Sequence, residues 1–156
     1  ERLFEPLGLD MTMDPSAQLP DKAISHRKVL GGNYEVVDWT WTQVGDGGIQ
    51  ATPSELVRWA DNFRTGDLGG STLQYAQLAD AARTSLSASE RFDTERYGAG
   101  FFIGIDGGLF DLGEWEEYTT ALEITPDRRV AAAVACNSDW LVPSATATIL
   151  TLIWSS

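Results

Sequence analysis

Residues 101–136 decide the fold, and they read FFIGIDGGLFDLGEWEEYTTALEITPDRRVAAAVAC. Short apolar and aromatic runs alternate there with turn signals, a pattern typical of strands joined by hairpins. The turn signals are Asp106-Gly107-Gly108 and Pro126-Asp127-Arg128. The runs between them predict strands at residues 101–105, 109–112, 118–125 and 130–136. We expect an antiparallel sheet whose last strand, apolar throughout, is central and covered on both faces.

One helix before these strands is strongly indicated. Thr52 supplies an N-cap, and it is followed by Pro53 and by Glu55 in the first turn. An apolar stripe then recurs with helical spacing, and Gly66 lies just past its end. The stripe consists of Leu56, Trp59, Ala60 and Phe63.

The remaining segments carry weaker signals. A second helix is expected at about residues 72–86, and the tail at 144–154 fits a helix that covers the sheet better than it fits a strand. Residues 1–9 read as a helix end that Pro6 and Gly8 stop, whereas residues 10–48 read as irregular. The fold class is therefore α+β: an antiparallel sheet with a C-terminal covering helix and a helical or irregular N-terminal segment.

The charge balance is strongly acidic, with 23 Asp and Glu against 11 Lys and Arg and a net charge of −12. Such a field repels polyanions, so we expect neither nucleic acid nor an anionic membrane as a partner. No run approaches the ~18 apolar residues that a membrane span needs. We expect no cofactor and no metal, and Cys136 reads as a buried small hydrophobe.

Four segments in order resemble one family. Residues 2–9 (RLFEPLGL) resemble the "ifePLGM" stretch of class C β-lactamases and their esterase and peptidase relatives. Residues 45–56, completed by Arg58-Trp59, are similar to the family's "GxGGlxsTxxDl" segment. Residues 97–101 resemble its "YGlGf" strand, and Pro126-Asp127 with residues 134–137 resembles its last turn and strand. The resemblance implies the C-terminal half of a β-lactamase/transpeptidase-like fold.

The family's chemistry uses three motifs. A Ser-x-x-Lys motif supplies the nucleophile and a Tyr-x-Asn-type motif transfers protons, and the resemblance implies that both lie upstream of this chain. The third motif, Lys-Thr-Gly or His-x-Gly on a sheet strand, falls here on Asp111-Leu112-Gly113, with only the glycine kept. Glu117 also replaces the glycine that precedes Tyr118. A carboxylate at these positions would repel an acidic substrate and a developing oxyanion.

Other candidate sites have competing interpretations. Ser25 and Lys28 match Ser-x-x-Lys, but no helical pattern holds them on one face. His26, the only histidine, fits an exposed loop better than a zinc site or a Ser-His-Asp arrangement. The acidic residues around Glu114 fit a solvated loop better than a cation site, and Glu114 with Glu116 fits an acid–base pair poorly. These acidic residues are Asp106, Asp111, Glu114, Glu116 and Glu117.

The loop before the strong helix is a candidate groove wall. Trp39, Trp41 and Asp46 precede a Gly47-Gly48 turn, and aromatic walls with one polar group suit an apolar acyl substrate. The alternative is that both tryptophans simply pack under the loop. We place Glu114 with these three residues as the candidate substrate-binding set.

The resemblance also implies a division of the chain. Residues 1–96 would form part of the helical and loop region lining the groove, and residues 97–156 the sheet strands and C-terminal helix. The expected partners are the N-terminal half of the same hydrolase, on another chain or missing, and a small acyl substrate. Family members are often extracytoplasmic. The rival hypotheses are a noncatalytic binding or scaffold module with a degenerate third motif and a free-standing small domain.

Overall fold

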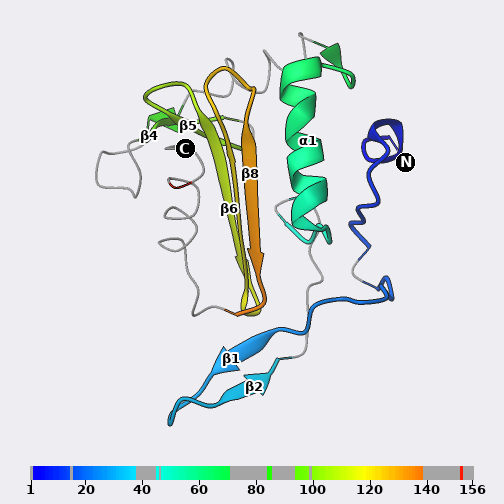
Figure 1. Cartoon of the computed structure of the whole chain (residues 1–156), viewed down its shortest axis with the longest axis vertical. Coiled ribbons are helices and arrows are strands. Elements are labelled where there is room, and N and C mark those ends of the chain that lie inside the picture. Colours follow the sequence, from blue (N-terminus) through cyan, green and yellow to red (C-terminus); the bar gives the residue numbers. More distant parts are fainter. Residues whose placement is uncertain are drawn as a thin grey trace.

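The computed structural model describes residues 2–14, 16–37, 45, 47–70, 84–85, 94–98, 100–138 and 152. Within these residues the centre is a six-stranded antiparallel sheet with the order β3-β4-β5-β6-β7-β8 (Figure 1). The four strands predicted between residues 101 and 136 are confirmed, although β6 runs on to Trp115 instead of ending at 112. The strands are β3 (Thr84–Ser85), β4 (Thr94–Tyr97), β5 (Phe102–Gly104), β6 (Leu109–Trp115), β7 (Tyr118–Ile124) and β8 (Ala131–Cys136).

The turns between these strands follow the residue types that the sequence provides. Gly107 has φ 87°, a left-handed conformation that glycine adopts without steric cost, and Gly108 donates its N–H to Asp106 Oδ1 at 2.8 Å. At the next predicted turn, Thr125 Oγ1 donates to Asp127 Oδ1 at 2.7 Å. Both predicted turns therefore join neighbouring antiparallel strands.

Helix α1 (Pro53–Thr65) covers one face of the sheet (Figure 1). Thr52 and Glu55 form a capping box, and Gly66 ends the helix at φ 70°, as the sequence predicted. The ring of Phe63 packs edge-on against Phe101, with centroids 4.9 Å apart. Burial of each large side chain in this layer contributes about 2 kcal/mol. The core cluster is Ala60, Phe63, Phe101, Ile103, Leu109, Leu122 and Ile124.

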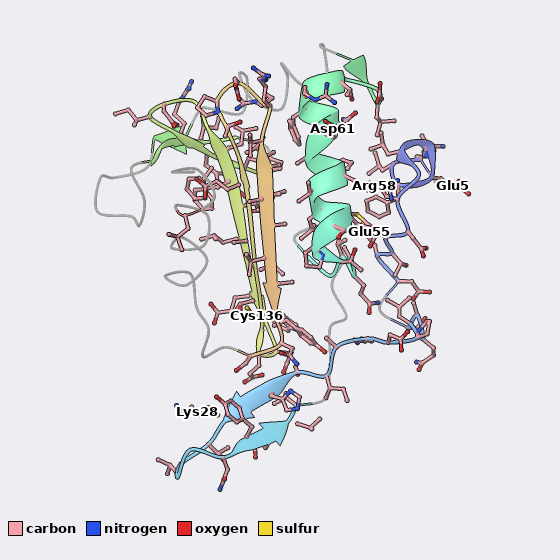
Figure 2. All side chains as sticks on the ribbon, in the orientation of Figure 1. Glu5, Lys28, Glu55, Arg58, Asp61 and Cys136 are labelled. Atoms are coloured by element: carbon pink, nitrogen blue, oxygen red, sulfur yellow. The ribbon has the colours of Figure 1, made fainter. Side chains whose placement is uncertain are left out.

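The outer side of α1 contacts the start of the chain. The helix end expected at residues 1–9 is not found in the described residues 2–9, which contain a single 3-10 turn, η1 (Glu5–Leu7). Pro6 fits within that turn, and Gly8 ends it at φ 63°. Arg58 on α1 reaches back, and its Nη2 donates to the Gly8 carbonyl at 2.7 Å (Figure 2).

Residues 10–48 are less irregular than expected, because they contain an antiparallel hairpin of β1 (His26–Lys28) and β2 (Tyr34–Val36). Gly31 and Gly32 turn the chain at φ 91° and 82°. The hairpin lies below the end of the sheet where β8 finishes (Figure 1). A glycine pair in a five-residue loop between two short runs is a recognised hairpin signal, and it could have identified this element.

Three further expectations fare differently. The prediction of a helix at 72–86 is wrong at its end, where residues 84–85 form β3. Residues 71–83 lie outside the described part of the chain. The tail helix at 144–154 also lies outside it, apart from Leu152. β8 pairs only with β7 among the described strands, so the central position expected for it is not found there. Four of its residues are alanines, which carry little apolar area to bury, so an apolar run alone did not require two covered faces.

No helix in the described residues is long and apolar enough to span a bilayer.

Candidate functional site

Strand β6 carries the third-motif positions, and its backbone orientation is fixed by one hydrogen bond. The N–H of Gly104 donates to the Gly108 carbonyl at 2.9 Å, so the Gly108 backbone faces β5. Backbone groups alternate in direction along an antiparallel strand, so Leu112 and Glu114 face the same side. Along β6, β5 pairs only with Leu109 and Phe110. Within the described residues, the outward N–H and C=O groups of Leu112 and Glu114 therefore lie along an unpaired strand edge.

Asp111 points to the face of the sheet that packs on α1. It lies opposite Leu122 in the register, on the same side as Leu109 and Ile124. Burial raises the pKa of Asp111 to about 6, against a smaller lowering by a hydrogen bond with the Leu112 backbone. Where the family has a lysine or histidine, this chain thus has a partly desolvated carboxyl that titrates below neutral pH.

Gly113 is required sterically at its position. A Cβ atom built there would lie 2.4 Å from Thr120 Oγ1, its neighbour across β7. Such an approach is not tolerated unless the threonine moves. Gly113 and Glu114 are exposed, so the strand surface is open at this point.

The turn that follows β6 has an unusual backbone. Trp115 pairs with Tyr118, and the two residues between them, Glu116 and Glu117, have φ of 44° and 61°. A two-residue hairpin turn of this type needs φ > 0 at both positions, which normally favours glycine or asparagine. The family's glycine at position 117 thus has a conformational reason, and Glu117 occupies the same left-handed region at a cost of about 1–2 kcal/mol.

This turn contacts the β1–β2 hairpin. Arg27 Nε on β1 donates to Glu117 Oε1 at 2.5 Å, and the Glu117 side chain is 9% exposed. The hydrogen bond and charge of Glu117 raise the pKa of Arg27. Tyr118 Oη also donates to the Ala23 carbonyl at 2.5 Å. Residues some ninety positions apart in sequence therefore meet beside the third motif.

The end of β8 is attached to the same hairpin. The N–H of His26 donates to the Asn137 carbonyl at 2.9 Å, and Asn137 Nδ2 donates to the Ile24 carbonyl at 2.8 Å. Figure 2 shows Cys136 at this end of β8, just above the hairpin. Cys136 is only partly buried, so the full burial expected for it is not found. Sequence reasoning missed all of these contacts, because no local pattern records a pairing between distant segments.

The other candidates identified from the sequence are placed as follows. Ser25 is 1% exposed and its Oγ donates to the Val37 carbonyl at 2.9 Å, so this serine is structural. His26 lies in β1 and is half-buried, not in an exposed loop as expected. Trp39, Trp41 and Asp46 lie outside the described residues.

The acidic residues do not converge on one point. Glu114 lies in β6 on the face opposite Asp111, whereas Glu116 lies in the turn, so the two do not form a pair on one strand face. Among the described residues, no group of three or more His, Cys, Asp and Glu side chains is arranged to hold a metal ion. A second carboxyl with a raised pKa belongs to Glu123, which lies towards the opposite end of the sheet. Burial and, to a smaller extent, the charge of Asp106 raise the pKa of Glu123 to about 7.

The family model for β-lactamases matches residues 1–150. This chain belongs to the β-lactamase family. The match covers both the sheet and the segments before it, which confirms the resemblance that the four sequence segments indicated. No curated protein sequence matches the chain significantly.

Solved structures share the fold. The penicillin-binding protein from Bacillus halodurans has a TM-score of 0.73 and 18% identity, over 95% of this chain and 47% of its own. The octameric penicillin-binding protein homologue from Pyrococcus abyssi has a TM-score of 0.75 and 20% identity, over 96% of this chain and 36% of its own. A D-stereospecific amidohydrolase from Streptomyces sp. has a TM-score of 0.63 and 17% identity, over 89% of this chain and 42% of its own. The chain thus spans less than half the length of each of these three proteins.

Proposed function

We propose that this chain is the C-terminal portion of a β-lactamase-like serine hydrolase that cleaves esters or amides through an acyl-serine. One observation carries the proposal: the backbone groups of Leu112 and Glu114 face outward at the third-motif position, along an edge that no described strand pairs. Strand-edge amides are held rigidly, so they can donate to an oxyanion without reorganising. The neighbouring carbonyl groups can bind an extended acyl chain as an added strand.

Within this proposal each third-motif residue has a role. The Glu114 N–H stabilises the oxyanion, and Gly113 keeps the strand flat opposite Thr120. Asp111, with a pKa raised to about 6, is mostly ionised at neutral pH and disfavours substrates that carry a carboxylate nearby. Neutral esters or amides are therefore the preferred substrate class.

The nucleophile comes from outside this chain. Ser25 is buried and bonded to the Val37 carbonyl, which excludes it as an attacking group. The Ser-x-x-Lys and tyrosine motifs lie upstream, so the chain is not catalytic alone, and its partner is the N-terminal half of the same hydrolase. Residues 1–96 line the groove, with Trp39, Trp41 and Asp46 on one wall. Residues 97–156 supply strands β5 to β8 and a C-terminal helix, whereas β3, most of β4 and helix α1 come from the first segment.

A reconstitution experiment tests the proposal. The chain is combined with the matching N-terminal half, and hydrolysis of p-nitrophenyl acetate and nitrocefin is measured. We expect p-nitrophenolate release with an initial burst as the serine is acetylated, little nitrocefin turnover, and no activity from either half alone. No hydrolysis of either compound by the folded, combined protein would contradict it.

Proline substitution tests the backbone role directly. Glu114→Pro removes an N–H that faces away from β7, so the β6–β7 pairing is kept. We expect kcat to fall about 100-fold or more, as for loss of one oxyanion donor. Glu114→Ala keeps the N–H, and we expect its kcat to fall far less. Equal losses in the two variants would mean that the side chain, not the backbone, is used.

A noncatalytic binding or scaffold module is the second candidate. It is favoured because Asp111 stands where the family's third motif has a lysine or histidine, and Leu112 stands where the Lys-Thr-Gly form has a threonine. A fluorophosphonate probe separates the two functions, because it labels the upstream serine only in an active hydrolase.

A further inference from the structure

The β6–β7 turn is held in a conformation that its own residues disfavour. Glu116 and Glu117 both have positive φ, and neither is glycine or asparagine. A turn of this kind persists only where surrounding contacts determine it. The contacts must therefore come from outside the turn.

The β6–β7 pairing closes the turn, and the β1–β2 hairpin supplies a side-chain contact that holds it. Arg27 Nε bonds Glu117 Oε1 at 2.5 Å, and the second oxygen of Glu117 is buried without a hydrogen-bond partner among the described residues. Arg27 itself is 48% exposed and lies 3.9 Å from Glu35 on the neighbouring strand. Three carboxylates, those of Glu117, Glu35 and Glu116, act on this one guanidinium, so it is poorly suited to bind a substrate anion. The Arg27 guanidinium is instead suited to bind the Glu117 carboxylate and keep it in place.

We propose that Arg27 is a positioning residue for the candidate active site. Through Glu117 it fixes the β6–β7 turn against the hairpin, and so fixes the direction of the outward-facing Glu114 backbone. Glu114 pairs with Thr119, directly next to the Trp115–Tyr118 pair that closes the turn, so any tilt of the turn moves it. This inference rests on the proposed use of the β6 edge as the substrate site.

Variants in the reconstituted enzyme test the inference. Arg27→Gln leaves Glu117 without its cation, and we expect kcat/KM for p-nitrophenyl acetate to fall about tenfold, mainly in kcat, as for a small misplacement of a reacting group. Arg27→Lys keeps the charge but not the planar donor geometry, and should recover part of the loss. Glu35→Gln is the matched control: it removes the carboxylate on β2 that lies near Arg27 without changing a residue of the turn, and should leave kcat/KM unchanged.

A double-mutant cycle separates positioning from direct substrate contact. In the Glu117→Gly background Arg27 has lost its hydrogen-bond partner on the turn, so adding Arg27→Gln should cost little further activity. A full additional loss in that background would mean that Arg27 contacts the substrate, and would overturn the inference. So would an Arg27→Gln enzyme that melts at a lower temperature but keeps both kcat and KM.

A second readout does not depend on hydrolysis. In the isotopically labelled chain, Arg27→Gln should shift the amide NMR resonances of Leu112 and Glu114, whereas Glu35→Gln should not. If the reconstituted wild type is inactive but these shifts occur, the proposed function fails and the positioning contact stands. Unshifted resonances in folded Arg27→Gln would refute the positioning role, whatever the activity.

Discussion

The two ends of strand β6 are held by different forces. At its core end, around Leu109, β6 packs under α1, and both Leu109 and its partner Ile124 are 1% exposed. At its hairpin end, around Trp115, the strand surface is exposed and the contacts are polar. They include the Arg27–Glu117 pair and the Tyr118–Ala23 hydrogen bond. Non-directional apolar burial thus stabilises one end, and directed long-range polar contacts orient the other.

This contrast means that stability and site geometry should be separable. Substitutions at the core end should lower the free energy of unfolding, because buried apolar area contributes most of it. Relative to the core end, substitutions at the hairpin end should affect activity more and stability less, because the polar contacts there orient the strand and remove little apolar area from water.

The largest loss is expected at the core end. Leu109→Ala removes a fully buried side chain and leaves a cavity, so the free energy of unfolding should fall by about 3 kcal/mol. Urea denaturation followed by tryptophan fluorescence measures it. Leu30→Ala, in the hairpin loop where the leucine is 101% exposed, is the control and should change little. Similar losses in both variants would remove the distinction between the ends.

The next effect is a dependence of stability on pH. Burial raises the pKa of Asp111 to about 6 and that of Glu123 to about 7. The folded protein then binds more protons than the unfolded chain, so stability is present at about pH 4 and is lost as pH rises towards 7. The shifts imply roughly 3 kcal/mol for each group, and we expect about 2 kcal/mol each after allowance for partial exposure to solvent.

Amide variants test this pH dependence. Asp111→Asn combined with Glu123→Gln cannot ionise at either position, so urea midpoints measured between pH 4 and 8 should vary much less. Glu114→Gln, an exposed change on the same strand, should keep the wild-type profile. A wild-type protein that becomes more stable over this range would contradict the assigned burial.

A smaller effect is expected at the start of α1. Thr52→Ala removes the side chain that caps the helix through the Glu55 N–H, and should cost about 1 kcal/mol. Ser54→Ala, an exposed change in the same turn, is the control. Because α1 packs on the core end, Thr52→Ala should lower the melting temperature of the reconstituted enzyme while its kcat at 25 °C stays near the wild-type value.

The smallest stability change separates a structural serine from a nucleophile. Ser25→Ala loses the bond to the Val37 carbonyl and should destabilise the hairpin end by about 1 kcal/mol or less. If Ser25 is structural, the reconstituted enzyme should still show a burst of p-nitrophenolate from p-nitrophenyl acetate. Loss of the burst in a folded Ser25→Ala protein would show that the serine is used in catalysis.

Much of the core end could be predicted from the sequence. The Asp106–Gly108 turn, the Thr52 cap and the helical stripe of α1 are local patterns, and each is confirmed. The burial of apolar side chains fixes the register of these strands, because a strand that slipped by one residue would expose Leu109 and Ile124. The placement of the third motif at Asp111-Leu112-Gly113 stays a prediction from the family resemblance, and these residues lie in strand β6.

The hairpin end could not be predicted in the same way. Arg27 and Glu117 are each ordinary charged residues in sequence, and only the fold brings them within 2.5 Å. Two glutamates also give no turn signal, so the left-handed turn at residues 116–117 follows from its closure between β6 and β7. The expectation of an irregular segment at 10–48 failed at the hairpin because its strands are only three residues long, too short for a periodic signal.

The most direct test of the central claim is to locate the acylated residue. The chain and its N-terminal half are combined, treated with a fluorophosphonate probe, and digested for peptide mass spectrometry. We expect the label on a serine of a Ser-x-x-Lys sequence in the N-terminal half, and none on residues 1–156. A label on Ser25, or a folded complex with no label at all, would contradict the assignment of this chain as the substrate-edge half of a serine hydrolase.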